Sequence, residues 1–126
     1  NLENLLVDKI MELPAPVSPG MTVMKFVDTM IPLYKRIAFP VSADRQLFGF
    51  VLLADLKQKL PREKWHETKI KDVMRQINEN HFVQLGSSLV EARAIMSSNG
   101  LGAVGVLDDK CDLVGFIQNS RIRIRN

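Results

Sequence analysis

Apolar residues recur at spacings of three and four in two stretches of the chain, which predicts two helices with one buried face each. The residues of these stripes are Val23, Phe26, Val27 and Met30 in the first stretch and Leu89, Ala92, Ile95 and Met96 in the second. Thr22 and Ser88 precede the stripes, where a hydroxyl can accept from the unpaired N–H groups of a helix start. Ser88 and Glu91 also fit a capping box, and Gly100 suits the end of the second helix.

Two short apolar runs with polar turn residues between them follow each predicted helix. They span 37–42 and 46–53 in the first half, and 102–107 and 112–117 in the second. Such paired runs predict antiparallel hairpins. A short extended piece precedes each helix, at Pro16-Val17 and at Phe82-Val83, and a second helix is expected to begin near Ala54-Asp55 and near Asn119-Ser120. Each half therefore has the predicted order β-α-β-β-α.

The two halves repeat one another in sequence. An offset of 66 places residues 22–23 over 88–89, Val17 over Val83 and Gly49 over Gly115, whereas Pro40 aligns best with Gly105 at an offset of 65. One-residue changes of this kind are tolerated in loops. One half alone would bury too little surface to be robust, so we expect the halves to pack against each other about a pseudo-twofold axis.

The predicted fold class is therefore α/β (α+β), with two β-α-β-β-α repeats and a leading N-terminal helix. The apolar residues among the first thirteen suggest that this helix caps the pair. The predicted boundaries are 1–13 for the leading helix, 14–60 for the first repeat, 61–73 for a linker and 74–126 for the second repeat.

Composition and charge restrict the function without selecting one. The chain is 46% hydrophobic and 25% charged, as globular domains are, and its net charge of +3 gives no strong signal for nucleic acid. The single cysteine, Cys111, excludes an internal disulfide framework. No apolar run approaches the roughly 18 residues needed to span a bilayer. Since the chain begins without Met and ends after alternating arginines, we expect it to be a piece of a longer protein.

Groups that could carry catalysis are scarce. His66-Glu67 begins like the zinc-protease pattern H-E-x-x-H, but Ile70 stands at the second ligand position. Cys111 lies among acidic residues, which disfavour a thiolate. We therefore predict neither an enzyme nor a metal site in this chain. Trp65 could anchor a partner, but a lone Trp in such a segment is expected to pack back on its own domain.

Paired β-α-β-β-α units with "FPV" before a hairpin and "G-hydrophobic-hydrophobic…D" after it resemble a tandem CBS-domain module, named for cystathionine β-synthase. The resemblance spans about 14–126. It implies a non-catalytic regulatory module that binds an adenosine-containing metabolite, such as AMP, ADP, ATP or S-adenosylmethionine, in clefts between the repeats, and that controls an attached effector absent from this chain. It also implies the alternative of a ligand-free interaction module, because CBS pairs often form homodimers through helix faces.

The resemblance implies a candidate cleft in each repeat. In the first, the candidate ligand-binding residues are Val17, Thr22, Ala38, Pro40 and Asp55; in the second they are Val83, Ser88, Ala103, Gln118 and Arg121. An ionised Asp55 can accept from both ribose hydroxyls, although Leu52 departs from the hydroxyl residue that the family usually has three positions earlier. Alternatively, Asp55 is mainly a helix cap.

The second cleft departs further from the family pattern. Arg121 stands in the place of Asp55, and an arginine only donates hydrogen bonds, so it cannot take the ribose hydroxyls. It can bind a phosphate bidentately at a helix start, or it is a solvated member of the arginine run. The sequence therefore predicts two inequivalent clefts.

The segment "LPREKWHETKIKDVM" (60–74) carries a narrower resemblance. It is similar to the linker between CBS units in the cytoplasmic extensions of site-2-protease-like intramembrane zinc metalloproteases. This resemblance implies a membrane-embedded zinc metalloprotease as the parent and the cytoplasmic face of a membrane as the location of this chain.

Overall fold

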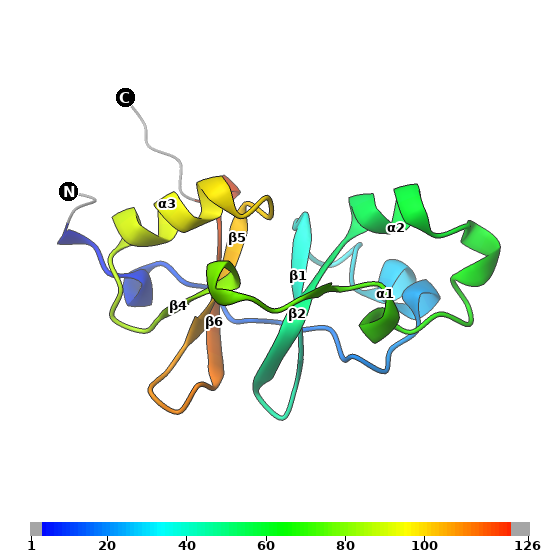
Figure 1. Ribbon diagram of the computed structural model, residues 1–126, viewed down its shortest axis with the longest axis horizontal. Coiled ribbons are helices and arrows are strands. Elements are labelled where there is room, and N and C mark those ends of the chain that lie inside the picture. Colours follow the sequence, from blue (N-terminus) through cyan, green and yellow to red (C-terminus); the bar gives the residue numbers. More distant parts are fainter. Residues whose placement is uncertain (1–3, 122–126) are drawn as a thin grey trace. The chain divides into compact units, whose positions relative to one another are not determined.

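The computed structural model describes residues 4–121, with Arg121 described by its backbone alone (Figure 1). It contains two three-stranded sheets, with strand orders β1-β2-β3 and β4-β5-β6. The chain forms two compact units: Ala15–Ile77, and the segment up to Pro14 together with the chain from Asn78 onward. Each unit contains one of the sheets, so the α+β class predicted from the sequence is confirmed.

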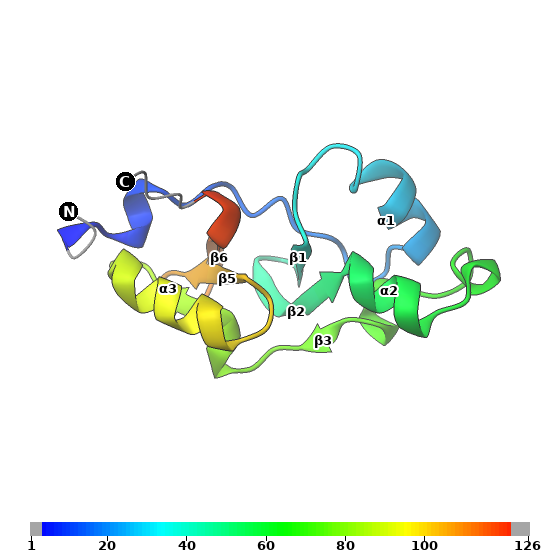
Figure 2. The ribbon, with the colours of Figure 1, turned by 90° about the horizontal axis from the view of Figure 1, so that it is seen from above.

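The first sheet belongs to the unit Ala15–Ile77. Its elements are α1 (Val23–Thr29), β1 (Ala38–Ala43), β2 (Gln46–Leu52), α2 (Leu53–Lys59), the 3-10 helices η3 (Arg62–Lys64) and η4 (Ile70–Asp72), and β3 (Arg75–Gln76). Strands β1 and β2 form an antiparallel hairpin. Asp44 and Arg45 connect them with φ angles of 50° and 66°, as the tight two-residue turns of hairpins require. Figure 2 shows β3 alongside β2, and the two strands pair antiparallel.

Helix α1 and the first hairpin enclose an apolar core. Phe26 and Phe39 are fully buried and meet edge to face, with ring centroids 5.0 Å apart. Trp65 is 5% exposed and donates its indole N–H to the Leu60 carbonyl at 3.1 Å. The prediction that Trp65 packs back on its own domain is therefore confirmed.

The second sheet belongs to the other unit. Its elements are η2 (Val7–Lys9), η5 (Glu79–His81), β4 (Phe82–Gln84), α3 (Leu89–Ser98), β5 (Ala103–Leu107), β6 (Leu113–Gln118) and η6 (Asn119–Arg121). Strand β5 pairs parallel with β4 and antiparallel with β6. The predicted helix signals are confirmed, since Ser88 Oγ accepts from the Glu91 N–H at 3.1 Å and Gly100, just past the helix, has a φ of 76°.

Strand pairing confirms the internal repeat and its change of offset. The equivalent parallel pairs are Val17 with Val41 and Val83 with Val106, and the equivalent antiparallel pairs are Val41 with Gly49 and Val106 with Gly115. Val17 and Val83 are therefore 66 positions apart, as are Gly49 and Gly115. Val41 and Val106, which lie between them in sequence, are 65 positions apart. Both hairpins also shift register directly after these valines. Beyond the shift Ser42 pairs with Leu47 and Leu107 pairs with Leu113, so the turn of the second hairpin is one residue longer and the offset returns to 66.

The prediction of a leading helix over 1–13 is wrong for residues 5–13. Within these residues only Val7–Lys9 is helical, in a single 3-10 turn. Glu12 is instead extended and exchanges two backbone hydrogen bonds of 2.9 Å with Phe116 of β6. The apolar residues also do not share one face, since Val7 is fully buried while Leu13 is 81% exposed. Pairing with the sheet therefore prevails over the apolar spacing that suggested a helix.

The second helix predicted near Asn119-Ser120 is present only as the 3-10 helix η6. Its expected continuation lies outside the described residues. In the first half, by contrast, the predicted helix is confirmed as α2, which begins directly after β2.

The chain before each repeat also repeats itself. Val7 and Ile70 are both fully buried, and each accepts backbone hydrogen bonds from the residues three and four positions later. Five residues after these anchors, Glu12 pairs with Phe116 and Arg75 pairs with Phe50. Residues 7–12 and 70–75 therefore hold equivalent positions beside β6 and β2, each within its own unit.

Candidate ligand-binding site

Three of the predicted residues of the first repeat lie on β1 or beside it. The Val17 N–H donates to the Pro40 carbonyl at 2.8 Å, and the Val17 carbonyl accepts from Ser42 at 3.0 Å. Ala38 pairs with Leu52, the last residue of β2. The side chains of Val17 and Ala38 are buried. The structure therefore brings Val17, Ala38 and Pro40 together through their backbones, next to the point where α2 begins.

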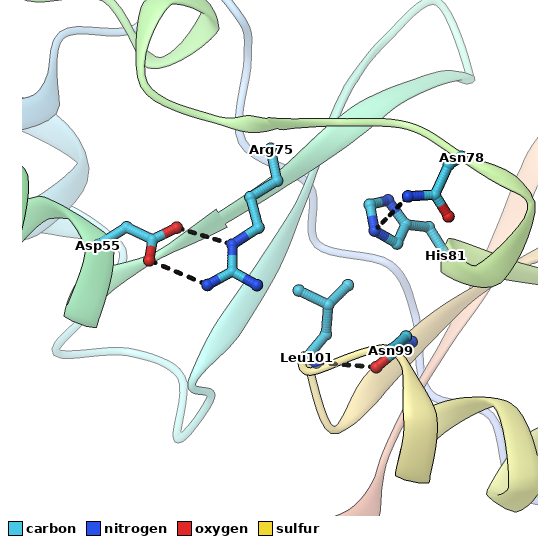
Figure 3. A network of polar contacts seen from close by, with 6 residues as sticks. All are labelled: Asp55, Arg75, Asn78, His81, Asn99 and Leu101. Atoms are coloured by element: carbon cyan, nitrogen blue, oxygen red, sulfur yellow. Dashed lines mark hydrogen bonds and ion pairs between the residues drawn. The ribbon is translucent and has the colours of Figure 1, made fainter.

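Asp55 lies in the first turn of α2 and is 8% exposed. Both of its carboxylate oxygens accept hydrogen bonds from Arg75 of β3, with Nε to Oδ2 at 2.9 Å and Nη2 to Oδ1 at 3.0 Å (Figure 3). The N-cap residue of this helix is Leu52, and no side-chain hydrogen bond caps the helix there. The alternative in which Asp55 is mainly a helix cap is therefore wrong, because its carboxylate is held by Arg75.

The pair is ionised at neutral pH. The hydrogen bonds from Arg75 hold the pKa of Asp55 below its usual value of 3.8, although partial burial of the carboxylate opposes this effect, and Lys59 adds a weaker attraction. The same hydrogen bonds raise the pKa of Arg75 above its usual value. The Asp55 side chain is 10% exposed and that of Arg75 is 40% exposed, so the arginine covers the acid and itself faces solvent.

The hydroxyl of Thr22 caps a helix. Thr22 Oγ1 accepts from the Lys25 N–H at 3.2 Å, and the Thr22 backbone pairs with Lys69. Leu52, where the family usually has a hydroxyl, is 6% exposed. The polar group that the structure places nearest to Asp55 is therefore the Arg75 guanidinium.

The predicted residues of the second repeat are also engaged in the fold. Val83 pairs with Val106 in the sheet, and Ser88 caps α3. The Ala103 carbonyl accepts from Asn99 Nδ2 at 2.9 Å. Gln118 is 6% exposed and donates through Nε2 to Glu12 Oε2 at 3.4 Å. The Arg121 side chain lies outside the described part of the chain, so the prediction for Arg121 stays a prediction.

Asparagine side chains hold the loop between α3 and β5. Asn99 Nδ2 also donates to the Asn80 carbonyl at 2.8 Å, and Asn99 Oδ1 accepts from the Leu101 N–H at 2.8 Å (Figure 3). Asn78 and the buried His81 lie 3.3 Å apart, from Nδ2 to Nε2. This network fixes the backbone at the start of β5 and is structural.

Arg75 is the site residue that the sequence analysis did not select. It follows the segment that resembles a linker, and its pairing with β2 depends on contacts 20 or more positions apart in sequence. A signal was nevertheless present in the repeat of residues 7–12 at 70–75, which places Arg75 beside the strand that leads into Asp55.

Within residues 4–121, no group of three or more His, Cys, Asp or Glu side chains could hold a metal ion. No helix in this part of the chain is long and apolar enough to cross a membrane.

Comparison of structures identifies the fold of this chain, whereas comparison of sequences does not. No protein-family model and no curated protein sequence matches the chain. The CBS domain of a bacterial CNNM/CorC family Mg²⁺ transporter, in a structure with ATP, superposes with a TM-score of 0.80 at 14% identity, over 95% of this chain and 85% of that one. The chain has the CBS-domain fold.

Two further structures agree. The CBS domains of a transcriptional regulator from Streptococcus pneumoniae match with a TM-score of 0.76 at 20% identity, covering 94% of this chain and 96% of that one. The CBS-pair protein CBSX2 from Arabidopsis thaliana matches with a TM-score of 0.79 at 21% identity, covering 93% and 90%. The predicted resemblance in fold is therefore confirmed.

Proposed function

We propose that this CBS module binds an adenine nucleotide or a related adenosine-containing metabolite at Asp55 and thereby controls an attached effector. The observation that carries the proposal is the largely buried, ionised Asp55 carboxylate in the first turn of α2, close to the backbone of β1. A carboxylate can accept from both hydroxyls of a ribose. The CBS domain of the Mg²⁺ transporter, whose structure contains ATP, supports this ligand class.

Control of an effector requires that the ligand bind two states of the module with different affinities. A ligand at Asp55 would meet Arg75, and Arg75 belongs to the last strand of its unit before the chain enters the second unit at Asn78. Binding at this position would therefore act on the segment that joins the two repeats. This link is the route by which we expect occupancy to reach the effector.

Thermal unfolding tests the proposal. AMP, ADP, ATP and S-adenosylmethionine are each added at millimolar concentration, and at least one is expected to raise the melting temperature. A ligand at ten times its Kd stabilises the folded state by about 1.4 kcal/mol, which corresponds to roughly 5 °C for a domain of this size. Asp55→Ala should abolish the shift, and Asp28→Ala, an exposed acid in the same unit, should keep it. The absence of a shift with all four ligands would count against nucleotide binding.

The alternative is a ligand-free dimerisation module. The loop between α1 and β1 favours it, because Leu33 is 74% exposed and Ile37 is 65% exposed on the same unit, and exposed apolar groups of this kind often mark protein contacts. Light scattering separates the two functions. A stable homodimer without any ligand-induced shift supports the alternative, whereas a monomer with a shift supports the ligand sensor.

We also propose that the effector is a site-2-protease-like zinc metalloprotease and that the module lies at the cytoplasmic face of its membrane. The support is the resemblance of residues 60–74 to the linker of such proteins. The test is the coding sequence upstream of Asn1. Several long apolar segments with H-E-x-x-H would support this parent, and a different upstream domain would exclude it.

A further inference from the structure

We propose that Arg75 is a built-in competitor for the ligand at Asp55, an inference that rests on the nucleotide-binding function proposed above. In the structure the guanidinium takes both carboxylate oxygens, one through Nε and one through Nη2. A ribose diol recognised by Asp55 would need the same two oxygens. Ligand binding is therefore an exchange of partners at Asp55, with Arg75 released as the ribose hydroxyls bind.

The exposure of the pair shows why the two partners exclude each other. The Asp55 side chain is 10% exposed while Arg75 covers it. An ionised carboxylate has further acceptor sites on each oxygen, but here little of its surface is left for a second pair of donors. Side-on pairing with an arginine is also strong and directional. A ribose can therefore form hydrogen bonds with the Asp55 carboxylate only after the Arg75 guanidinium has moved away from it.

Arg75 is able to move because its side chain is not part of the core. It is 40% exposed, and β3, which carries it, is only two residues long. The backbone of β3 is held separately, by pairing with Gly49 and Phe50 and by a hydrogen bond of 3.0 Å from the Ile77 N–H to the Phe48 carbonyl. The guanidinium can therefore leave Asp55 while the sheet stays intact.

The second repeat supplies a natural template for a control. Its positions equivalent to Asp55 and Arg75 are occupied by Arg121 and Glu12, so the signs of the two charges are exchanged. The double variant Asp55→Arg with Arg75→Glu copies these charges into the first repeat. It keeps opposite charges at the two positions and removes the acceptor from the start of α2.

Calorimetric titration with AMP tests the proposal on the wild type, Arg75→Lys, Arg75→Gln and the double charge exchange. Lysine keeps the positive charge near a phosphate but loses the bidentate fork. Arg75→Lys is therefore expected to bind AMP up to about fivefold more tightly than the wild type, a gain of the size expected when a partly exposed ion pair with the competitor is weakened. Arg75→Gln is expected to show the same direction of change. The double charge exchange should fold with wild-type circular dichroism and bind no AMP.

The outcomes separate this inference from the proposed function. Tighter binding by Arg75→Lys that Asp55→Asn abolishes supports the competitor, including the case in which only the Arg75 variants bind. If the wild type binds AMP through Asp55 but Arg75→Lys binds equally or more weakly, the competitor is excluded and the function stands. If neither the wild type nor either Arg75 variant binds, both fail. Binding that survives Asp55→Asn places the ligand elsewhere and also excludes the competitor.

Discussion

Gly49 and Gly115 hold equivalent positions in β2 and β6, but an alanine would meet different neighbours at the two sites. At Gly49 an added Cβ would collide with the backbone carbonyl oxygen of Arg75, and the Met74 sulfur would be 3.3 Å away. At Gly115 all three nearest atoms belong to the Met11 side chain, with the sulfur in collision, Cγ at 3.0 Å and Cβ at 3.1 Å. A change of rotamer can move the methionine sulfur and Cγ away and leaves only the Cβ contact, whereas a paired strand backbone cannot move away without leaving the sheet.

The difference in stability can be estimated from these contacts. Overpacking costs about 1–3 kcal/mol in general, and Gly49→Ala should lie at the upper end because it also separates β3 from β2. Each lost backbone hydrogen bond adds about 1 kcal/mol. We therefore expect Gly49→Ala to lower the free energy of unfolding by about 3–4 kcal/mol. For Gly115→Ala we expect about 1 kcal/mol or less, because alanine also restricts the unfolded chain, which returns about 0.5 kcal/mol.

Urea unfolding measures both values when it is followed by the fluorescence of Trp65, the single tryptophan, for the unit that contains Gly49, and by circular dichroism, which also reports on the unit that contains Gly115. The double variant Gly115→Ala with Met11→Ala is the control, because Met11→Ala removes the sulfur and Cγ and leaves only Cβ, at 3.1 Å. Relative to Met11→Ala alone, the extra methyl group should then cost less than it does in the wild-type background. Equal losses for the two glycine variants, or a larger loss for Gly115→Ala, would refute the assignment of a rigid backbone neighbour to Gly49 and a flexible one to Gly115.

Two further predictions follow from Asp55 and Trp65. The pKa of Asp55 is lowered in the folded state, so the stability that its carboxylate contributes is present above its usual pKa of 3.8 and is lost as the pH falls through the folded-state pKa. Near neutral pH the wild type should be more stable than Asp55→Asn by about 1–2 kcal/mol, the value of a charged hydrogen bond in a partly exposed pair. In urea titrations this difference should shrink at acidic pH, and a constant difference would contradict the ion pair. Trp65→Ala should lower the free energy of unfolding, measured with denaturant, by about 3–4 kcal/mol, because removal of the buried ring leaves a cavity. Arg62→Ala removes only the cation lying 5.2 Å above that ring and should lower the free energy of unfolding by less than about 1 kcal/mol. Similar losses for the two variants would contradict the buried position of Trp65.

The elements that the sequence predicted well are those determined by local signals. Each of these signals depends on residues that are close together in sequence. The structure has a helix at the apolar stripe that ends at Met30, a helix cap at Ser88 and a hairpin turn at Asp44. The internal repeat strengthened the prediction of the fold, because two segments with the same order of predicted helices and strands are compatible with fewer folds than one segment is. The predicted succession of a helix and a two-stranded hairpin agrees with the structure in both units, as α1-β1-β2 and α3-β5-β6.

The errors arose where distant residues decide the conformation. The segment before Pro14 has helical spacing, but Glu12 exchanges its backbone hydrogen bonds with Phe116, more than 100 positions away in sequence. The candidate site could likewise be predicted only in part, because it also depends on residues that are distant in sequence. Asp55 does lie at the start of a helix, as the sequence predicted, but its partner in the structure, Arg75, comes from a strand of two residues. No periodicity reveals a strand of that length, and only the repeated segment indicated it.

The change from Asp55 to Arg121 has a different meaning once the strand partners are known. Considered alone, it removes a carboxylate from one repeat and suggests that only the ligand site has changed. The equivalent partner position changes as well, from Arg75 to Glu12, so both repeats keep opposite charges at these two positions. Opposite charges at these two positions are therefore what the sequences of the two repeats share. A carboxylate at the start of the second helix, the group that the proposed recognition of a ribose needs, is the feature in which the first repeat differs from the second.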